Sequence, residues 1–181
     1  MAKISEKIEQ IYETGLDTKS RTLLLQGEVD DEMLHNVECS LTILENISKE
    51  PINIRLSTGG GNVYAGCAII DRIENSPCEI RIHAAGEIMS MGILLLAAGD
   101  VRTSGELTVF MWHEESDTVE GRLSQSKSYL KFSDKLDDRL CRWMGTRTKK
   151  PYKFWKDLGK GQDYYFFKEE AIEIGLINET N

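Results

Sequence analysis

Ser90 is the residue whose sequence surroundings best suit chemistry. It follows a strand-like run, Glu79–His83, and directly precedes an apolar run, Met91–Ala98, that predicts a short helix. Unpaired backbone N–H groups and the positive end of a helix dipole gather at such a strand–turn–helix junction, where they stabilise an anionic tetrahedral intermediate. We therefore predict that Ser90 is a nucleophile, with simple helix capping as the alternative.

Small residues flank this serine. Gly86 and Gly92 would allow backbone or substrate to approach closely, and Gly99 is expected to end the helix in the left-handed conformation. The Gly-x-Ser-x-Gly elbow of the α/β-hydrolases is absent, because position 88 is Ile. The sequence therefore argues against the α/β-hydrolase fold.

A glycine loop, Ser57–Asn62, joins a predicted strand, Ile52–Ser57, to a predicted helix, Val63–Glu74. A nucleotide-binding P-loop would end in Gly-Lys-Ser/Thr, and a dinucleotide motif would need glycine where Tyr64 stands, so both readings fail. Two interpretations stay open. The loop is either a tight turn that permits close helix packing or an oxyanion hole built from backbone N–H groups.

A serine hydrolase needs a general base, and the chain has three histidines, His35, His83 and His113. His35 falls among polar residues of a predicted helix, where a solvated histidine is the default. His83 ends a strand and has packing or capping as its simpler role. His113 ends the predicted strand Leu107–Trp112 and is well placed to project into a site, although a lone histidine is more often structural.

Composition narrows the classes of function. A chain of 181 residues with 40% hydrophobic content suits one domain, 1–181, and a net charge of −8 disfavours a nucleic-acid partner. The longest apolar run, Ile93–Ala98, is too short to cross a bilayer, and the amphipathic pattern of Met1–Glu13 lacks a signal-peptide core. We expect a cytoplasmic protein without cofactor or metal, because its cysteines form no paired motif: Cys39, Cys67, Cys78 and Cys141.

The chain alternates predicted strands and helices up to His113, which indicates an α/β layered fold. A long predicted helix, 122–146, follows. It carries a stripe of apolar residues at helical spacing: Tyr129, Phe132, Leu136, Leu140 and Trp143. Such a stripe must be covered, either by its own domain or by another subunit. Beyond it we expect a short helix, Pro151–Leu158, a strand, Tyr164–Phe167, and a terminal helix, Lys168–Ile174.

Several motifs occur in order over nearly the full length of the chain: Gly27–Glu32, Gly60–Gly66, Ser90–Gly99 and Met111–His113. With these motifs the sequence resembles the ClpP family, the proteolytic subunits of the ATP-dependent Clp protease, as a divergent member such as a phage-borne copy. Asp163 stands at the spacing of the family's acidic residue. The order Ser, His, Asp differs from the orders in α/β-hydrolases, chymotrypsin and subtilisin.

The resemblance implies a crotonase-like spiral of strand–strand–helix units, with helix 122–146 as a protruding handle between rings. It also implies a homo-oligomer, a heptameric ring or double ring. The sequence departs from the family in four places: the N-terminal segment 1–20, Gly59 for proline, the stretch His113–Asp117, and Gly161–Gln162 for an acid–Arg pair. Because Gly161–Gln162 cannot make charged contacts between rings, we expect a single ring or an easily separated double ring.

The implied activity is that of a serine endopeptidase acting on polypeptides, fed by a Clp-type ATPase unfoldase. In this reading Ser90 attacks the peptide carbonyl, His113 acts as base and then acid, and Asp163 orients the imidazole. The N–H groups of Gly60 and Met91 hold the oxyanion. The alternatives are a phage head-maturation protease, or a catalytically silent crotonase-fold scaffold or acyl-thioester binder.

Overall fold

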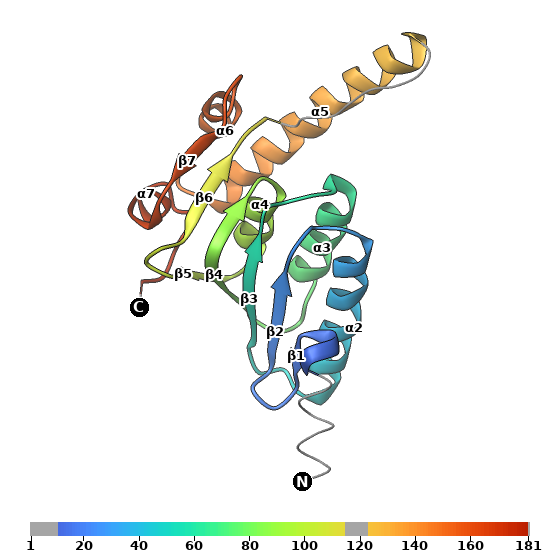
Figure 1. The fold of residues 1–181 in the computed structure, drawn as a ribbon, viewed down its shortest axis with the longest axis vertical. Coiled ribbons are helices and arrows are strands. Elements are labelled where there is room, and N and C mark those ends of the chain that lie inside the picture. The colour runs from blue at the N-terminus through green and yellow to red at the C-terminus, as the bar shows by residue number, and fades with distance from the viewer. Residues whose placement is uncertain (1–10, 115–122, 181) are drawn as a thin grey trace.

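A seven-stranded sheet forms the centre of the protein, for which a computed structural model describes residues 11–114 and 123–180 (Figure 1). The strands are β1 (Leu16–Asp17), β2 (Thr22–Gln26), β3 (Ile52–Thr58), β4 (Ile80–Met89), β5 (Val101–Ser104), β6 (Val109–Trp112) and β7 (Tyr164–Phe166). Their order is β1-β2-β3-β4-β6-β7, with β5 also paired to β4. Strands β2 to β6 pair in parallel, whereas β1 and β7 are antiparallel to their neighbours.

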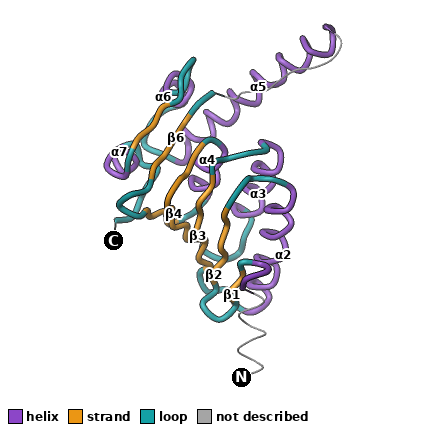
Figure 2. The backbone as a smooth tube through the Cα atoms, in the orientation of Figure 1, coloured by secondary structure: helices purple, strands orange, loops and turns teal. Residues whose placement is uncertain are grey.

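Helices α2, α3 and α4 lie along one face of this sheet (Figure 2). The helices are α2 (Asp31–Ile47), α3 (Val63–Glu74), α4 (Met91–Ala98), α5 (Leu123–Arg147), α6 (Tyr152–Leu158) and α7 (Lys168–Glu173). The predicted α/β class is confirmed, whereas the helix expected in Met1–Glu13 lies largely outside the described residues. No helix in the described ranges is both long and apolar enough to cross a membrane.

Strand register explains why one face is covered. Leu23 of β2 lies opposite Ile54 of β3, which lies opposite Ile82 of β4, and all three side chains are buried. The next residues, such as Arg55 and His83, point to the other face because side chains alternate along a strand. The apolar row is therefore the side on which the helices pack.

Strand β4 is longer than predicted, because it continues past His83 to Met89. Its first half pairs with β5 and its last residues pair with β6. Gly86, between the two halves, has φ +71°, a conformation that glycine adopts readily. This change of partner carries β4 directly to Ser90.

Side-chain caps fix the starts of two helices. The Asp30 carboxylate accepts a hydrogen bond from the Met33 N–H at 2.8 Å, and Asn62 caps α3 in the same way. The prediction for Gly99 was wrong, because its φ is −65°. Glycine is needed there for space, since a Cβ would lie 2.7 Å from Cγ1 of Ile82.

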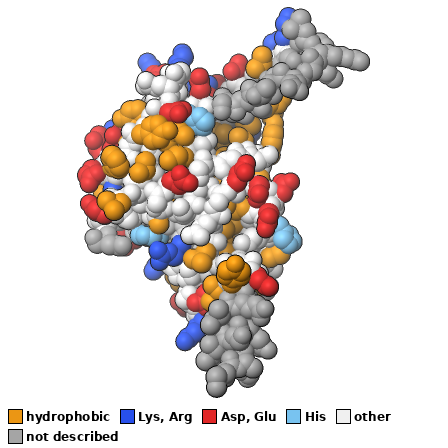
Figure 3. Space-filling view, viewed as in Figure 1, with side chains coloured by type: hydrophobic (Ala, Val, Ile, Leu, Met, Phe, Trp, Pro, Cys, Tyr) orange, Lys and Arg blue, Asp and Glu red, His pale blue; other side chains and the backbone are white. Residues whose placement is uncertain are grey.

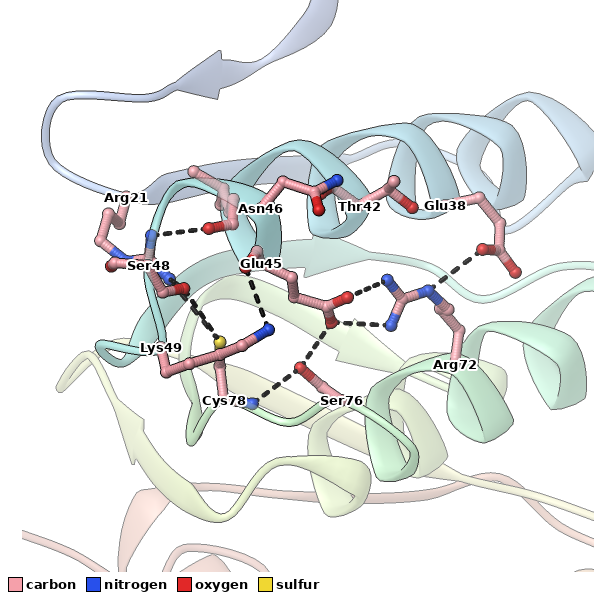
Figure 4. Close-up of polar contacts among 11 residues, drawn as sticks. Arg21, Glu38, Thr42, Glu45, Asn46, Ser48, Lys49, Arg72, Ser76 and Cys78 are labelled. Atoms are coloured by element: carbon pink, nitrogen blue, oxygen red, sulfur yellow. Dashed lines mark hydrogen bonds and ion pairs between the residues drawn. The ribbon is translucent and has the colours of Figure 1, made fainter.

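An ion-pair network joins α2 to α3 (Figure 4). The Arg72 guanidinium donates to both carboxylate oxygens of Glu45, at 2.8 and 2.7 Å, and the Ser76 hydroxyl donates to the same carboxylate. Hydrogen bonding from Arg72 lowers the pKa of Glu45. Glu38 adds a more exposed contact to Arg72 at 3.1 Å.

Helix α5 projects from the body of the molecule (Figure 1). Cys141 and Met144, near its C-terminal end, are buried, and Leu140 and Trp143 pack against the core. Phe132, farther out, is 49% exposed. The inner part of the apolar stripe is therefore covered by the same domain, while cover of the outer part by another subunit stays a prediction.

The buried Arg102 holds the ends of three helices together. Its guanidinium donates to the carbonyls of Gly99 after α4, Arg147 at the end of α5, and Gly175 and Leu176 after α7. Burial, and then the nearby Arg147 charge, lowers the pKa of Arg102 to about 10. These contacts fix the C-terminal end of α4, the helix that Ser90 begins.

Candidate active site

Ser90 occupies the tight junction between β4 and α4. Its N–H donates to the Met111 carbonyl of β6 at 2.9 Å, and its backbone has φ +51° and ψ −120°. Such a conformation costs a non-glycine residue about 1–3 kcal/mol and persists only where surrounding structure enforces it. The Ser90 side chain makes no capping hydrogen bond, so the simple capping alternative is wrong.

His113 is the histidine that the structure places beside Ser90. The parallel pairing of β4 and β6 sets Met89 opposite Met111, so the residues that follow the two strands meet at the same edge of the sheet. His113 Nε2 lies 2.7 Å from Ser90 Oγ. This is the hydrogen-bond geometry of a hydroxyl next to a general base.

The other two histidines have different neighbours. His35 Nε2 lies 3.6 Å from the Cys39 thiol, one turn away on α2. His83 Nδ1 lies 2.9 Å from the Thr103 hydroxyl of β5. Burial, followed by the Arg55 charge, lowers the pKa of His83, which favours a neutral imidazole in the fold.

Asp163 reaches His113 from the far side of the ring. It immediately precedes β7, and the antiparallel pairing of Trp112 with Tyr164 brings it next to His113. The distance from Asp163 Oδ1 to His113 Nδ1 is 3.9 Å, and the Asp163 side chain is 54% exposed. This contact is longer than a hydrogen bond, so it acts on the imidazole chiefly through charge.

The glycine loop lies directly against the serine. Gly60 has φ +99°, and a Cβ there would be 2.7 Å from Ser90 Cβ and 3.1 Å from the Met91 nitrogen. The Gly60 N–H donates to Thr58 Oγ1 at 3.1 Å. Met91, as the first residue of α4, has no carbonyl of its own helix to receive its N–H.

A pocket of about 260 Å³ opens beside Ser90 and His113. It is lined by Gly61, Val63, Ser90, Met91, Leu94, Trp112, His113, Asp137 and Leu140. A larger hollow of about 540 Å³, between β2 and α2, contains neither Ser90 nor His113, so size alone does not identify the site. Sequence reasoning missed Asp137, because nothing local indicates which face of α5 turns toward the pocket.

The site is thus a hydroxyl bonded to an imidazole, at a helix N-terminus, next to a largely apolar pocket. Such a set can transfer an acyl group from an amide or ester to the serine and then to water. Among the described residues, no group of three His, Cys, Asp or Glu side chains is arranged to hold a metal ion.

Comparisons with known proteins agree with this chemistry. The family model for Clp protease matches residues 4–180. The chain is 30% identical over 164 residues to the ATP-dependent Clp protease proteolytic subunit 2 of Pseudomonas aeruginosa, covering 89% of this chain and 81% of that protein. It is 28% identical over 180 residues to the proteolytic subunit of Borreliella afzelii, covering 96% and 88% of the two chains.

A solved structure shares the fold. A point mutant of ClpP1 from Listeria monocytogenes matches with a TM-score of 0.83 and 26% identity, covering 91% of this chain and 92% of that one. The chain belongs to the Clp protease family, and it is a serine peptidase. The family resemblance and the fold expected from it are confirmed, whereas the likeness to crotonase stays a prediction.

Proposed function

We propose that this chain hydrolyses peptide bonds as the proteolytic subunit of a Clp-type protease, with Ser90 as nucleophile. His113 is its general base and Asp163 orients the imidazole. The observation that carries the proposal is the 2.7 Å contact between Ser90 Oγ and His113 Nε2 at the start of α4. The identity of the family supports the same reaction.

The reaction follows from these positions in two steps. His113 Nε2 takes the Ser90 proton as Oγ attacks the peptide carbonyl, and it then gives that proton to the leaving amine, which produces an acyl-enzyme. A water molecule, deprotonated by His113, attacks the ester, and the proton returns to Ser90 Oγ as the peptide acid leaves. The Asp163 charge stabilises the imidazolium in both steps.

Two backbone donors would hold the oxyanion. The Met91 N–H is one, because it lies at the N-terminus of α4 beside the nucleophile. The Gly60 N–H is the other, and it must exchange its bond to Thr58 Oγ1 for the oxyanion. We infer that this exchange accompanies substrate binding.

The exposed apolar surface supports self-assembly into a ring. Leu130 and Phe132, on the outer part of α5, are about half exposed. Apolar side chains also gather over β6 and β7 (Figure 3). They include Tyr165 and Phe167, which are more than half exposed. We propose a homo-oligomer, a single or weakly joined double heptameric ring in the cytoplasm, that receives unfolded polypeptides from a Clp-type ATPase.

The test of the proposed function is hydrolysis of a fluorogenic peptide. Purified wild-type protein should release the fluorophore, alone or with a Clp-type ATPase, and Ser90→Ala should reduce the rate to background with the fold unchanged by circular dichroism. Wild-type protein that cleaves an acyl-thioester but no peptide under any of these conditions would contradict the proposal and favour thioester chemistry.

A further inference from the structure

We propose that Asp137 makes the pocket beside Ser90 accept a basic side chain, lysine or arginine, from the substrate residue that supplies the scissile carbonyl. The inference rests on the proposed function of Ser90, because a side chain next to the attacked carbonyl is the one that can enter this pocket. It names a substrate preference that the family membership of the chain does not itself supply.

The walls of the pocket suit the stem of such a side chain. Val63, Leu94 and Leu140 contribute aliphatic surface, and Met91 and Trp112 add to it. Lysine and arginine carry methylene stems that pack on apolar surface while the charged end seeks a polar partner. Asp137 lies on the same pocket and, among its described lining residues, is the one carboxylate.

Asp137 does not have a cation to itself. Lys156 Nζ lies 2.5 Å from Asp137 Oδ2 and 2.9 Å from Asp138 Oδ1, so one cation serves two carboxylates. Burial alone would lower the pKa of Lys156, but its hydrogen bonds to these carboxylates outweigh burial and raise it. The pKa of Asp138 is lowered chiefly by its hydrogen bond from Lys156 and also by the nearby charge of Arg142, so Asp137 shares Lys156 with a carboxylate that has a second positive neighbour.

The Asp137 carboxylate can still accept a further hydrogen bond. Its Oδ1 receives the Cys141 thiol at 3.9 Å, which is a weak contact, and burial followed by the Asp137 charge raises the pKa of that thiol to about 12. The Asp137 side chain is 18% exposed, so its charge is only partly screened by water. A substrate cation in the pocket would gain a charge-assisted hydrogen bond, whereas a substrate carboxylate would be repelled.

The experiment compares peptides that differ only in the residue before the scissile bond: arginine, lysine, leucine or glutamate. The measured quantity is the ratio of kcat/KM for the arginine peptide to that for the leucine peptide. Both values come from one preparation, so any inactive fraction cancels. We expect the wild type to cleave the arginine and lysine peptides at least as well as the leucine peptide, and the glutamate peptide most slowly.

Three variants decide the role of Asp137. Asp137→Asn should lower the arginine-to-leucine ratio by roughly 10-fold to 100-fold. Lys156→Gln should raise that ratio, because it removes the competing cation. The matched control is Asp134→Asn, an exposed carboxylate on the same helix that does not line the pocket, and it should leave the ratio unchanged.

The outcomes separate this inference from the proposed function. Labelling of Ser90 by a fluorophosphonate probe shows that the nucleophile is intact in each variant. A labelled enzyme whose ratio is the same in wild type, Asp137→Asn and Lys156→Gln overturns the role of Asp137 alone. A wild-type protein that is neither labelled nor active overturns the proposed function itself.

Discussion

His113 makes two contacts of unequal length. Its bond to Ser90 is short, at 2.7 Å, whereas its contact with the exposed Asp163 is 3.9 Å. In a triad the acid fixes the imidazole through a hydrogen bond, and much of its effect is lost when that bond is absent. We therefore expect His113 to contribute more to the rate than Asp163.

We expect His113→Ala to reduce kcat by roughly 10³-fold or more, whereas Asp163→Asn should cost roughly 10²-fold, because the aspartate acts mainly through its charge. Single-turnover rates with one fluorogenic peptide would show the difference. The double variant should lose little beyond His113→Ala. Equal losses in the two single variants would mean that Asp163 engages the imidazole more closely during catalysis than at 3.9 Å.

Gly60 is required by space as well as by backbone conformation, and Gly27 provides a matched control. Both have positive φ, but an added Cβ at Gly27 meets nothing within 4 Å, whereas at Gly60 it would lie 2.7 Å from Ser90 Cβ. We expect Gly60→Ala to abolish peptide cleavage and probe labelling, and Gly27→Ala to keep most of both. Comparable activity in the two variants would contradict the close approach of the loop to the nucleophile.

Among single residues, sequence reasoning found those that a local pattern marks and that the fold brings together. Ser90 between a strand and an apolar helix, and His113 at a strand end, could be singled out from their neighbours alone, although the role of Asp163 came only from family resemblance. Asp137 could not be found, because its place at the pocket depends on how α5 packs. The conformation of Gly99 was predicted wrongly, because glycine is needed there to leave space for Ile82, which is distant in the sequence.

At the scale of elements, helices were easier to predict than strands. The bounds of α3 and α4 match the expected ranges, because Asn62 caps α3 locally and a continuous apolar run marks α4. Strand β4 was cut short at His83, since Gly86 and Glu87 look like a turn. What extends the strand is pairing of Glu87–Met89 with β6, a contact with residues much later in the chain.

The ion pair between Glu45 of α2 and Arg72 of α3 predicts how much this contact between helices stabilises the fold (Figure 4). Glu45→Gln should lower the free energy of unfolding by about 1–3 kcal/mol at pH 7, because it removes a charged bond that links α2 to α3. Glu38→Gln is the control and should change it by less than about 0.5 kcal/mol, since that side chain is half exposed. Urea unfolding followed by circular dichroism measures both.

The effect of Glu45→Gln should depend on pH. The pKa of Glu45 is lower in the fold than its ordinary value of 4.5, so its contribution is complete above that value. The contribution is lost as the pH falls through the lowered pKa. The stabilities of wild type and Glu45→Gln should therefore converge in acid, and a constant gap down to about pH 2 would contradict this account.

At the scale of the whole molecule, the uncovered apolar surface is the main feature still to be explained. The inner part of the apolar stripe on α5 packs against the core of the same chain, so Leu140→Asp would test folding rather than assembly. The outer part carries Phe132 and Leu130, both about half exposed. A surface of this kind is typical of a contact between subunits.

We expect Phe132→Asp to weaken assembly roughly 10-fold to 100-fold, because a buried phenylalanine contributes about 1.5–3 kcal/mol. Native mass spectrometry across a concentration and salt series measures the species present. Lys131→Asp, a neighbouring exposed position, is the control, and Gln162→Ala should also have little effect. A wild-type protein that is monomeric at micromolar concentration, or a Phe132→Asp variant that assembles as before, would show that α5 is not the cohesive surface.

Whether Ser90 is the nucleophile is tested directly by reaction with a fluorophosphonate probe. The mass of the labelled protein is measured, and the labelled peptide is then sequenced. We expect one probe per active subunit, attached to Ser90, with little labelling in His113→Ala and none in Ser90→Ala. Labelling that persists in Ser90→Ala, or a probe attached to a different residue of the wild type, would contradict the assignment of Ser90 as the nucleophile.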